Sequence, residues 1–164
     1  MMEIPTSLIE HTIHRGTIIH FYGFTDIDHG KFFVVVGVNA DCLVGFFFIN
    51  SSINRMIFGK QRLLDMQYPM KQTDYPFLRY DSFLCATNIM TIEKGVLAAD
   101  IASGTASIVG EMKAAHLSEL ISAARKSDYS RHSPAALWRE EVARDDAGHG
   151  ARHQRVQERS QGSR

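Results

Sequence analysis

Residues 75–97 read Tyr-Pro-Phe-Leu-Arg-Tyr-Asp-Ser-Phe-Leu-Cys-Ala-Thr-Asn-Ile-Met-Thr-Ile-Glu-Lys-Gly-Val-Leu. Pro76 disfavours helical geometry at the residue before it, so the aromatic stretch that begins here is predicted to be a tight turn leading to Asp81-Ser82. Residues 83–92 have the composition of a β-strand, and Glu93-Lys94-Gly95 interrupt the run. The segment therefore predicts a loop that leads into one half-buried strand over residues 82–92.

Three further long strands are predicted before this segment, at residues 17–22, 31–38 and 43–50. The second is a continuous β-branched and aromatic run, which is typical of a strand covered on both faces. The third follows after a short turn, so the two are expected to form a hairpin. Residues 63–71 are predicted as a short edge strand, because Pro69 cannot donate a ladder hydrogen bond.

Residues 107–126 carry apolar side chains at helical spacing, with an acidic residue in the first turn and basic residues in the last, which suits the helix dipole. Residues 1–15 are expected to be a loose or peripheral lead-in. Residues 128–164 hold few bulky apolar residues and end in a Gly-, Gln-, Ser- and Arg-rich stretch, so we expect a weakly helical and then disordered tail. The domain itself is predicted to span residues 16–127.

Several strands close in sequence, followed by a helix, predict a mainly β fold with a C-terminal α-helix, built as a small antiparallel barrel or a strongly twisted sheet. A chain of 164 residues that is 45% hydrophobic is expected to bury one core. The formal net charge is zero, which gives no global field for nucleic acid or membrane. A local basic patch is nevertheless enough to bind a phosphate backbone.

Cys42 and Cys85 lie in apolar, strand-like runs, so buried free thiols and a cytosolic protein are expected. The N-terminus lacks the basic flank and apolar core of a signal peptide. The longest apolar run, residues 43–49, is far shorter than the roughly 20 residues of a membrane span. The sequence therefore predicts a soluble cytoplasmic protein that does not enter a membrane.

No complete catalytic motif is visible: the sequence contains no nucleotide-binding glycine pattern, no paired His/Cys metal spacing and no Gly-x-Ser-x-Gly elbow. One candidate site is His29 with Lys31, at the end of a polar loop. A cation that begins a rigid strand suits a phosphate, and an imidazole can move a proton near neutral pH. The plain alternative is a solvated hairpin tip.

Two more segments carry polar groups that could act on a ligand. Asn50 and Ser51 end an apolar strand, where they could present an amide and a hydroxyl, or could only satisfy their own turn. The next segment has cations around an aromatic ring, which suits phosphate contact and base stacking in single-stranded RNA. Its alternative is a solvated loop that tucks the ring onto the core. The residues of this segment are Arg55, Phe58, Lys60 and Arg62.

Two histidines elsewhere are expected to be structural. His20 lies among apolar residues of the first predicted strand, so it is interpreted as a hydrogen-bonded core or rim histidine. His116 falls on the flank of the predicted helix and is assigned no chemistry.

Residues 16–126 resemble the MazF/PemK (CcdB-like) toxins. The resemblance rests on the order of the segments: a glycine before the first strand, a basic residue that begins the second, and small polar residues after the third. Its most specific part is Leu78 shortly before Asp81-Ser82, a strand that ends in Thr91-Ile92-Glu93, and the closing helix. The resemblance implies a small SH3-like barrel that forms a homodimer, binds an antitoxin protein and cleaves single-stranded RNA.

That family needs neither a metal nor another cofactor, because the ribose 2′-OH attacks its own phosphodiester. The family's arginine at the start of the second strand falls on Lys31, and its serine or threonine at the end of the third falls on Asn50, or on Ser51 if the register slips by one. Lysine keeps the charge without arginine's planar fork. Asparagine can donate to a phosphate oxygen but cannot do an alcohol's proton chemistry.

The sequence thus leads to the hypothesis of a toxin-like endoribonuclease. Lys31 would neutralise the scissile phosphate, Asn50 or Ser51 would bind it, and His29 would donate a proton, while the segment from Arg55 to Arg62 would guide the RNA. One rival is a non-catalytic relative that binds RNA or protein. A more distant one is a protein that acts through its basic C-terminal tail. The hypothesis requires Lys31 to lie beside the polar end of the third strand.

Overall fold

The centre of the fold is an antiparallel hairpin of two eight-residue strands, β2 (Lys31–Val38) and β3 (Leu43–Asn50). Successive side chains of a strand point to opposite faces of the sheet, and both faces of this hairpin are covered. The continuous apolar run of β2 is explained by this double burial. The computed structural model describes residues 4–24, 29–39 and 41–126. The predicted hairpin is confirmed.

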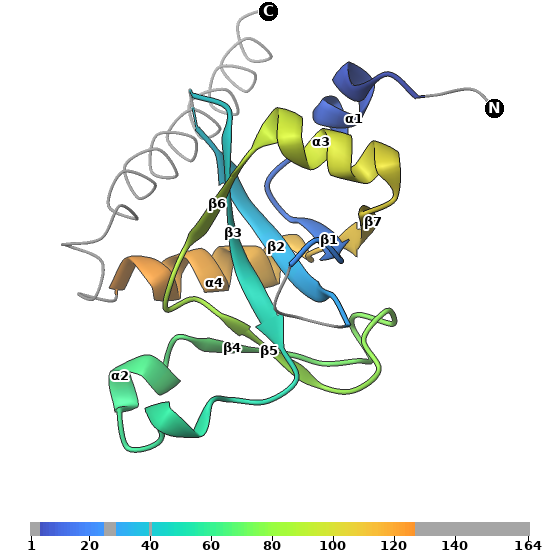
Figure 1. The fold of residues 1–164 in the computed structure, drawn as a ribbon. Helices are drawn as coiled ribbons and strands as arrows, with labels where there is room; N and C mark the ends of the chain where they lie inside the picture. Colours follow the sequence, from blue (N-terminus) through green and yellow to red (C-terminus); the bar gives the residue numbers. More distant parts are fainter. Residues whose placement is uncertain (1–3, 25–28, 40, 127–164) are drawn as a thin grey trace, which may run out of the picture. The chain divides into compact units, whose positions relative to one another are not determined.

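The remaining strands extend this hairpin into one antiparallel sheet with the order β4-β5-β3-β2-β1-β7, and β6 pairs with β3 (Figure 1). The two strands at the ends of this order, β4 and β7, are not paired with each other, so the described sheet is not closed into a barrel. The added strands are β1 (Thr17–Phe21), β4 (Gln67–Met70), β5 (Ser82–Cys85), β6 (Met90–Glu93) and β7 (Ala106–Glu111).

The segment predicted as one strand over residues 82–92 is two short strands, so that prediction is wrong in detail. β5 and β6 are separated by a turn, and both pair with the same edge of β3, one near each end. Thr87 and Asn88 lie in the turn between them. Polar turn-forming residues at this point interrupt the ladder although the flanking residues have strand composition.

The helix predicted over residues 107–126 begins later, at Ala114, because its first residues belong to strand β7. A helix that was not predicted, α3 (Lys94–Ser103), precedes this strand. It ends at Gly104, which adopts the left-handed conformation with φ +82°. Glycine is favoured at such a helix end because it has no Cβ to clash, and here it lets the chain turn back into the sheet.

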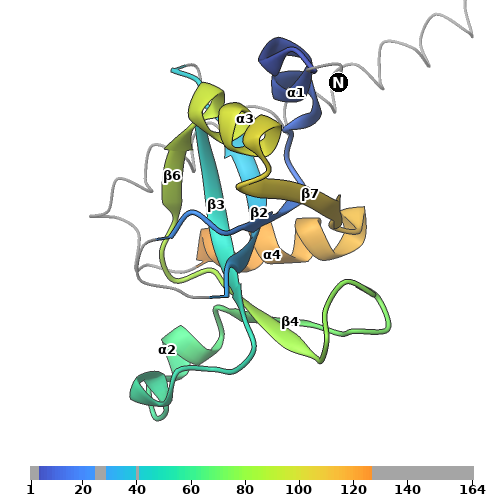
Figure 2. The same cartoon turned by 45° about the vertical axis from the view of Figure 1, so that its right-hand side comes forward.

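The sheet separates two apolar clusters. Helix α4 (Ala114–Lys126) covers one face, where Leu120 is buried, and α3 covers the other with Leu97. Figure 2 shows α3 and α4 on different sides of the strands. Residues 1–15, expected to be a loose lead-in, contain helix α1 (Thr6–Thr12), which packs beside α3, and Ile13 is only 2% exposed.

Neither cysteine side chain is fully buried. Cys42 is exposed at the turn of the central hairpin and Cys85 is half-buried, so the expectation of two buried thiols is wrong. Across residues 4–24, 29–39 and 41–126, no helix is long and apolar enough to cross a membrane. The predicted tail, residues 128–164, lies outside the described residues.

Candidate functional site

The candidate site begins with a pair of side chains at one end of the central hairpin. Lys31 begins β2 and Asn50 ends β3, and the neighbouring pair Phe32↔Ile49 fixes the antiparallel register that places them opposite each other. The Nζ atom of Lys31 donates a hydrogen bond of 2.8 Å to Oδ1 of Asn50. Lys31 therefore lies beside the polar end of the third strand, as the sequence hypothesis required of these two elements.

An aromatic ring positions the ammonium group further. Nζ of Lys31 lies 5.0 Å from the centre of the Phe48 ring, within the range of a cation–π contact. Phe48 and Asn50 are two residues apart on the same strand, so both side chains lie on the same face of the sheet as the ammonium. An ammonium has three donors, and the bond to Asn50 uses one of them. The protein thus orients the ammonium group of Lys31, and the N–H donors that remain are suited to bind an anion.

The other two predicted catalytic residues lie close to this pair along the chain. Ser51 directly follows β3, His29 is two residues before Lys31, and both side chains are exposed. Among the described residues, no hydrogen bond joins either of them to Lys31 or Asn50. The structure thus brings together the cation and the amide, and leaves the hydroxyl and the imidazole at the surface nearby.

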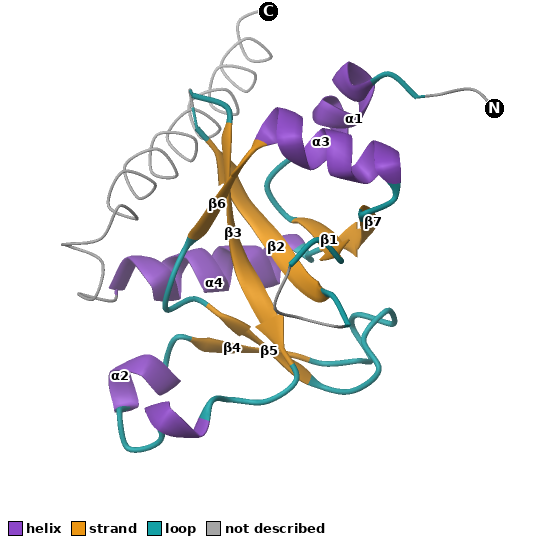
Figure 3. Cartoon of the chain, in the orientation of Figure 1, coloured by secondary structure: helices purple, strands orange, loops and turns teal. Residues whose placement is uncertain are grey.

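The predicted RNA-binding segment forms a small protrusion next to β4. It consists of the 3-10 helix η1 (Arg55–Ile57) and helix α2 (Gln61–Leu64), which Figure 3 shows at the edge of the sheet. Gly59, with φ +84°, makes the turn between them. Phe58 is 59% exposed, so the alternative in which it tucks onto the core is wrong. The cations of this segment, Arg55, Lys60 and Arg62, are also exposed.

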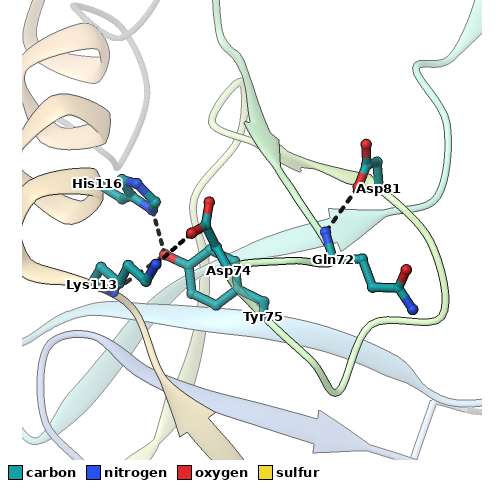
Figure 4. Close-up of polar contacts among 6 residues, drawn as sticks. All are labelled: Gln72, Asp74, Tyr75, Asp81, Lys113 and His116. Atoms are coloured by element: carbon teal, nitrogen blue, oxygen red, sulfur yellow. Dashed lines mark hydrogen bonds and ion pairs between the residues drawn. The ribbon is translucent and has the colours of Figure 1, made fainter.

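A second polar cluster, which the sequence interpretation missed, joins α4 to the loop after β4 (Figure 4). The Tyr75 hydroxyl lies 2.7 Å from Nδ1 of His116 and accepts a 3.2 Å hydrogen bond from the backbone N–H of Lys113. Lys113 also forms an ion pair with Asp74. His116, to which the sequence pattern assigns no chemistry, has a structural partner that lies 41 residues away in sequence.

The titration behaviour of this second cluster follows from burial and charge. Burial raises the pKa of the Tyr75 hydroxyl, and the hydrogen bond from Lys113 holds the pKa of Asp74 below its ordinary value. Burial also raises the pKa of Tyr68 well above its usual range, and its hydroxyl donates a 2.7 Å hydrogen bond to Glu119. Both tyrosines therefore stay neutral at physiological pH and act here as hydrogen-bonding groups that fasten α4.

His20 is a histidine in contact with two aromatic rings. Its ring stacks on Phe32, with centroids 4.1 Å apart and an interplanar angle of 18°, and lies 4.2 Å from the ring of Tyr22. Burial lowers the pKa of His20, and a hydrogen bond to the backbone of His29 acts in the opposite direction. The expectation of a hydrogen-bonded rim histidine fits this position.

Within the described part of the chain, no group of three or more His, Cys, Asp or Glu side chains is arranged to hold a metal ion. Neither models of known protein families nor curated proteins match this sequence. The function is therefore inferred from the geometry of the chain itself.

Proposed function

We propose that this protein is a toxin-like endoribonuclease of the MazF/PemK type, which cleaves single-stranded RNA. The observation that carries the proposal is the 2.8 Å contact between Nζ of Lys31 and Oδ1 of Asn50 at the shared end of β2 and β3. A cation that is held by a neighbouring amide on a rigid hairpin is a good binding group for a phosphodiester. The proposal includes an SH3-like fold in which the described sheet is open and not closed into a barrel.

The proposed reaction needs no metal. The ribose 2′-oxygen forms a bond to phosphorus while the bond from phosphorus to the 5′-oxygen breaks, which yields a 2′,3′-cyclic phosphate and a free 5′-hydroxyl. Lys31 stabilises the negative charge that grows on the phosphoryl oxygens. Because Oδ1 of Asn50 accepts from Lys31, the amide nitrogen is the part of Asn50 that is left to donate to the phosphate.

Proton transfer falls to the two exposed neighbours. His29 supplies a proton to the departing 5′-oxygen, and the Ser51 hydroxyl binds the phosphate or passes the proton of the 2′-OH to solvent water. Both residues are accessible to a large substrate at the end of the hairpin. The protruding segment with Arg55, Phe58, Lys60 and Arg62 guides the RNA by phosphate contact and base stacking. In this proposal the enzyme acts in the cytoplasm as a homodimer, and an antitoxin protein covers the same site.

A second candidate is a non-catalytic module that binds RNA or protein. The observation in its favour is that Arg55, Phe58, Lys60 and Arg62 of the protruding segment are exposed. By contrast, the Ser51 hydroxyl and the His29 imidazole make no hydrogen bond with the Lys31–Asn50 pair among the described residues. Such a surface supports binding without requiring proton transfer.

The experiment incubates the full-length protein with a long unstructured RNA in the presence of a chelator. We expect cleavage with 2′,3′-cyclic phosphate ends, and a loss of about a hundredfold or more in the rate for Lys31→Ala, which is the usual cost of removing a group that stabilises transition-state charge. Lys71→Ala removes an exposed lysine from the loop after β4 and serves as the matched control. RNA that is bound but not cut would support the binding module and contradict the nuclease.

A further inference from the structure

Tyr22 is an exposed aromatic residue at the same end of the sheet as Lys31. It directly follows β1, and the register pairs Phe21 with Lys31, so Tyr22 lies one residue beyond the partner of Lys31. The Tyr22 side chain is 54% exposed. Its backbone N–H donates a 2.8 Å hydrogen bond to the carbonyl of Thr105, which fixes the chain where β1 ends.

The ring of Tyr22 is backed by a row of other rings. Its centroid is 4.2 Å from that of His20, which stacks on Phe32, and Phe32 is 5.3 Å from Phe77. Phe32 and Phe77 pack against the apolar cluster under α4, so the inner end of the row is anchored in the core. The outer ring is therefore held by rigid neighbours while much of its surface stays open to solvent.

Gly30 brings the backbone unusually close to this ring pair. A Cβ atom at Gly30 would lie 2.9 Å from Nε2 of His20 and 2.9 Å from Cδ1 of Tyr22, closer than side chains approach one another in folded proteins. Gly30 also has φ +66°, a conformation that favours glycine. Lys31 follows immediately, so the segment that carries the phosphate-binding cation passes directly against the rings.

We propose that Tyr22, backed by His20, forms a stacking platform for one nucleobase of the RNA strand whose phosphate Lys31 binds. This inference rests on the proposed function, because it assigns a base-binding role next to the proposed phosphate site. Aromatic side chains bind single-stranded RNA by stacking on the faces of unpaired bases, and every base offers such a face. The platform holds the base on one side of residues 30–31, while the ammonium lies on the other face of the strand, beside Phe48.

The test measures binding separately from cleavage. The probe is a short single-stranded RNA with 2′-O-methyl riboses, which cannot undergo 2′-OH attack, and with one 2-aminopurine moved along its length. Wild-type protein is expected to quench the fluorescence at one position. Tyr22→Ala is expected to abolish this quenching and to weaken binding about tenfold, in the range of one lost base stack. Tyr22→Phe keeps the ring and is expected to retain both the quenching and the wild-type affinity.

Tyr80→Ala is the matched control, because Tyr80 is an exposed tyrosine in the loop before β5. Thermal unfolding of each variant checks that the fold is kept. An abasic site at the quenched position should remove the difference in RNA affinity between wild type and Tyr22→Ala. This result would identify the base as the partner of the ring. Equal binding of the RNA by wild type and Tyr22→Ala, with Lys31→Ala weaker, would overturn the platform and leave the phosphate site in place. Binding that depends on Tyr22, together with no cleavage of the unmodified RNA, would support the platform and overturn the nuclease.

Discussion

The contact between Lys31 and Asn50 arises within a single hairpin, whereas the contact between Tyr75 and His116 joins distant elements of the fold. Lys31 and Asn50 are 19 positions apart, but a tight antiparallel turn between two long strands brings the start of one to the end of the other. The contact between Tyr75 and His116 spans 41 positions and several elements. No local pattern predicts it, because the partners meet only after α4 has packed on the sheet.

His20 gives the protein a pH-dependent stability. Burial lowers its pKa below the ordinary value of 6.5, so the folded chain resists a proton that the unfolded chain accepts. The contribution of His20 to the free energy of unfolding is therefore nearly constant above that value and decreases as the pH falls below it. We expect the free energy of unfolding to decrease between pH 7.5 and pH 5.5, and the decrease to be smaller in His20→Gln, as measured by urea titration at each pH.

The control for this comparison is His11→Gln, which removes an exposed histidine from α1. The quantity compared is the pH slope of each variant, because His20→Gln also removes a stacked ring and changes stability at every pH. A slope that changes as much in His11→Gln as in His20→Gln would contradict the assignment to His20.

Tyr75 is expected to contribute measurably to stability through its hydroxyl. The residue is 3% exposed, and its oxygen meets both the backbone N–H of Lys113 and the ring of His116. Tyr75→Phe keeps the ring but leaves these groups without their partner, at a cost of about 1–3 kcal/mol in the free energy of unfolding. The matched change Tyr80→Phe, at an exposed tyrosine, should have an effect of no more than about 0.5 kcal/mol. Equal effects of the two substitutions in urea unfolding would show that the hydroxyl of Tyr75 stabilises the fold no more than an exposed one.

At the scale of the elements, the strands with long apolar runs were predictable, and those interrupted by turns were not. β2 and β3 have the expected bounds, since long apolar and aromatic runs of this composition leave little choice of structure. α3 carries no strong amphipathic pattern because it is short and packs between α1 and the sheet. The sequence pattern merges β7 with the following helix because the few residues of this strand also fit the helical spacing.

Gly104 and Gly95 allow the end of α3 to be tested with two matched substitutions. Gly104 has φ +82°, and a Cβ atom added there would meet no other atom within 4 Å, so Gly104→Ala suffers only from the backbone conformation, at a cost of about 1 kcal/mol or more. Gly95 is the second residue of the helix, where it is exposed and has no positive φ. Gly95→Ala is therefore expected to stabilise the protein by about 0.5–1 kcal/mol. Chemical denaturation of both variants measures the contrast, and a shared sign would contradict this description of the helix.

At the scale of the whole molecule, composition and pattern indicate a mainly β protein with a C-terminal helix, and this part is confirmed. Closure of the sheet into a barrel does not follow from composition and pattern, because it depends on whether the first and last strands of the order pair with each other. Here α3 follows β6 directly and returns the chain to the far edge, where β7 pairs with β1. That return leaves β4 and β7 at opposite ends of the order, and the sheet stays open among the described residues.

Because the formal net charge of the chain is zero, the salt dependence of RNA binding reports on the local cations that contact the RNA. Four cations are assigned to the RNA surface, at Lys31, Arg55, Lys60 and Arg62. A single strand releases roughly 0.7 counterions per neutralised phosphate, so the slope of log K against log salt should be no steeper than about −3. Arg62→Gln should flatten the slope by about 0.7, as measured with a 2′-O-methyl RNA at several salt concentrations.

Lys71→Gln removes an exposed cation outside this surface and should leave the slope unchanged. The same titration on a chain that lacks residues 149–164 tests the remaining alternative, in which the arginine-rich C-terminal tail binds the RNA. If the truncation flattens the slope and Arg62→Gln does not, the RNA is bound by the tail rather than by the sheet. Counterion release counts phosphates without regard to fold, so this measurement decides between the two surfaces even if no RNA is cut.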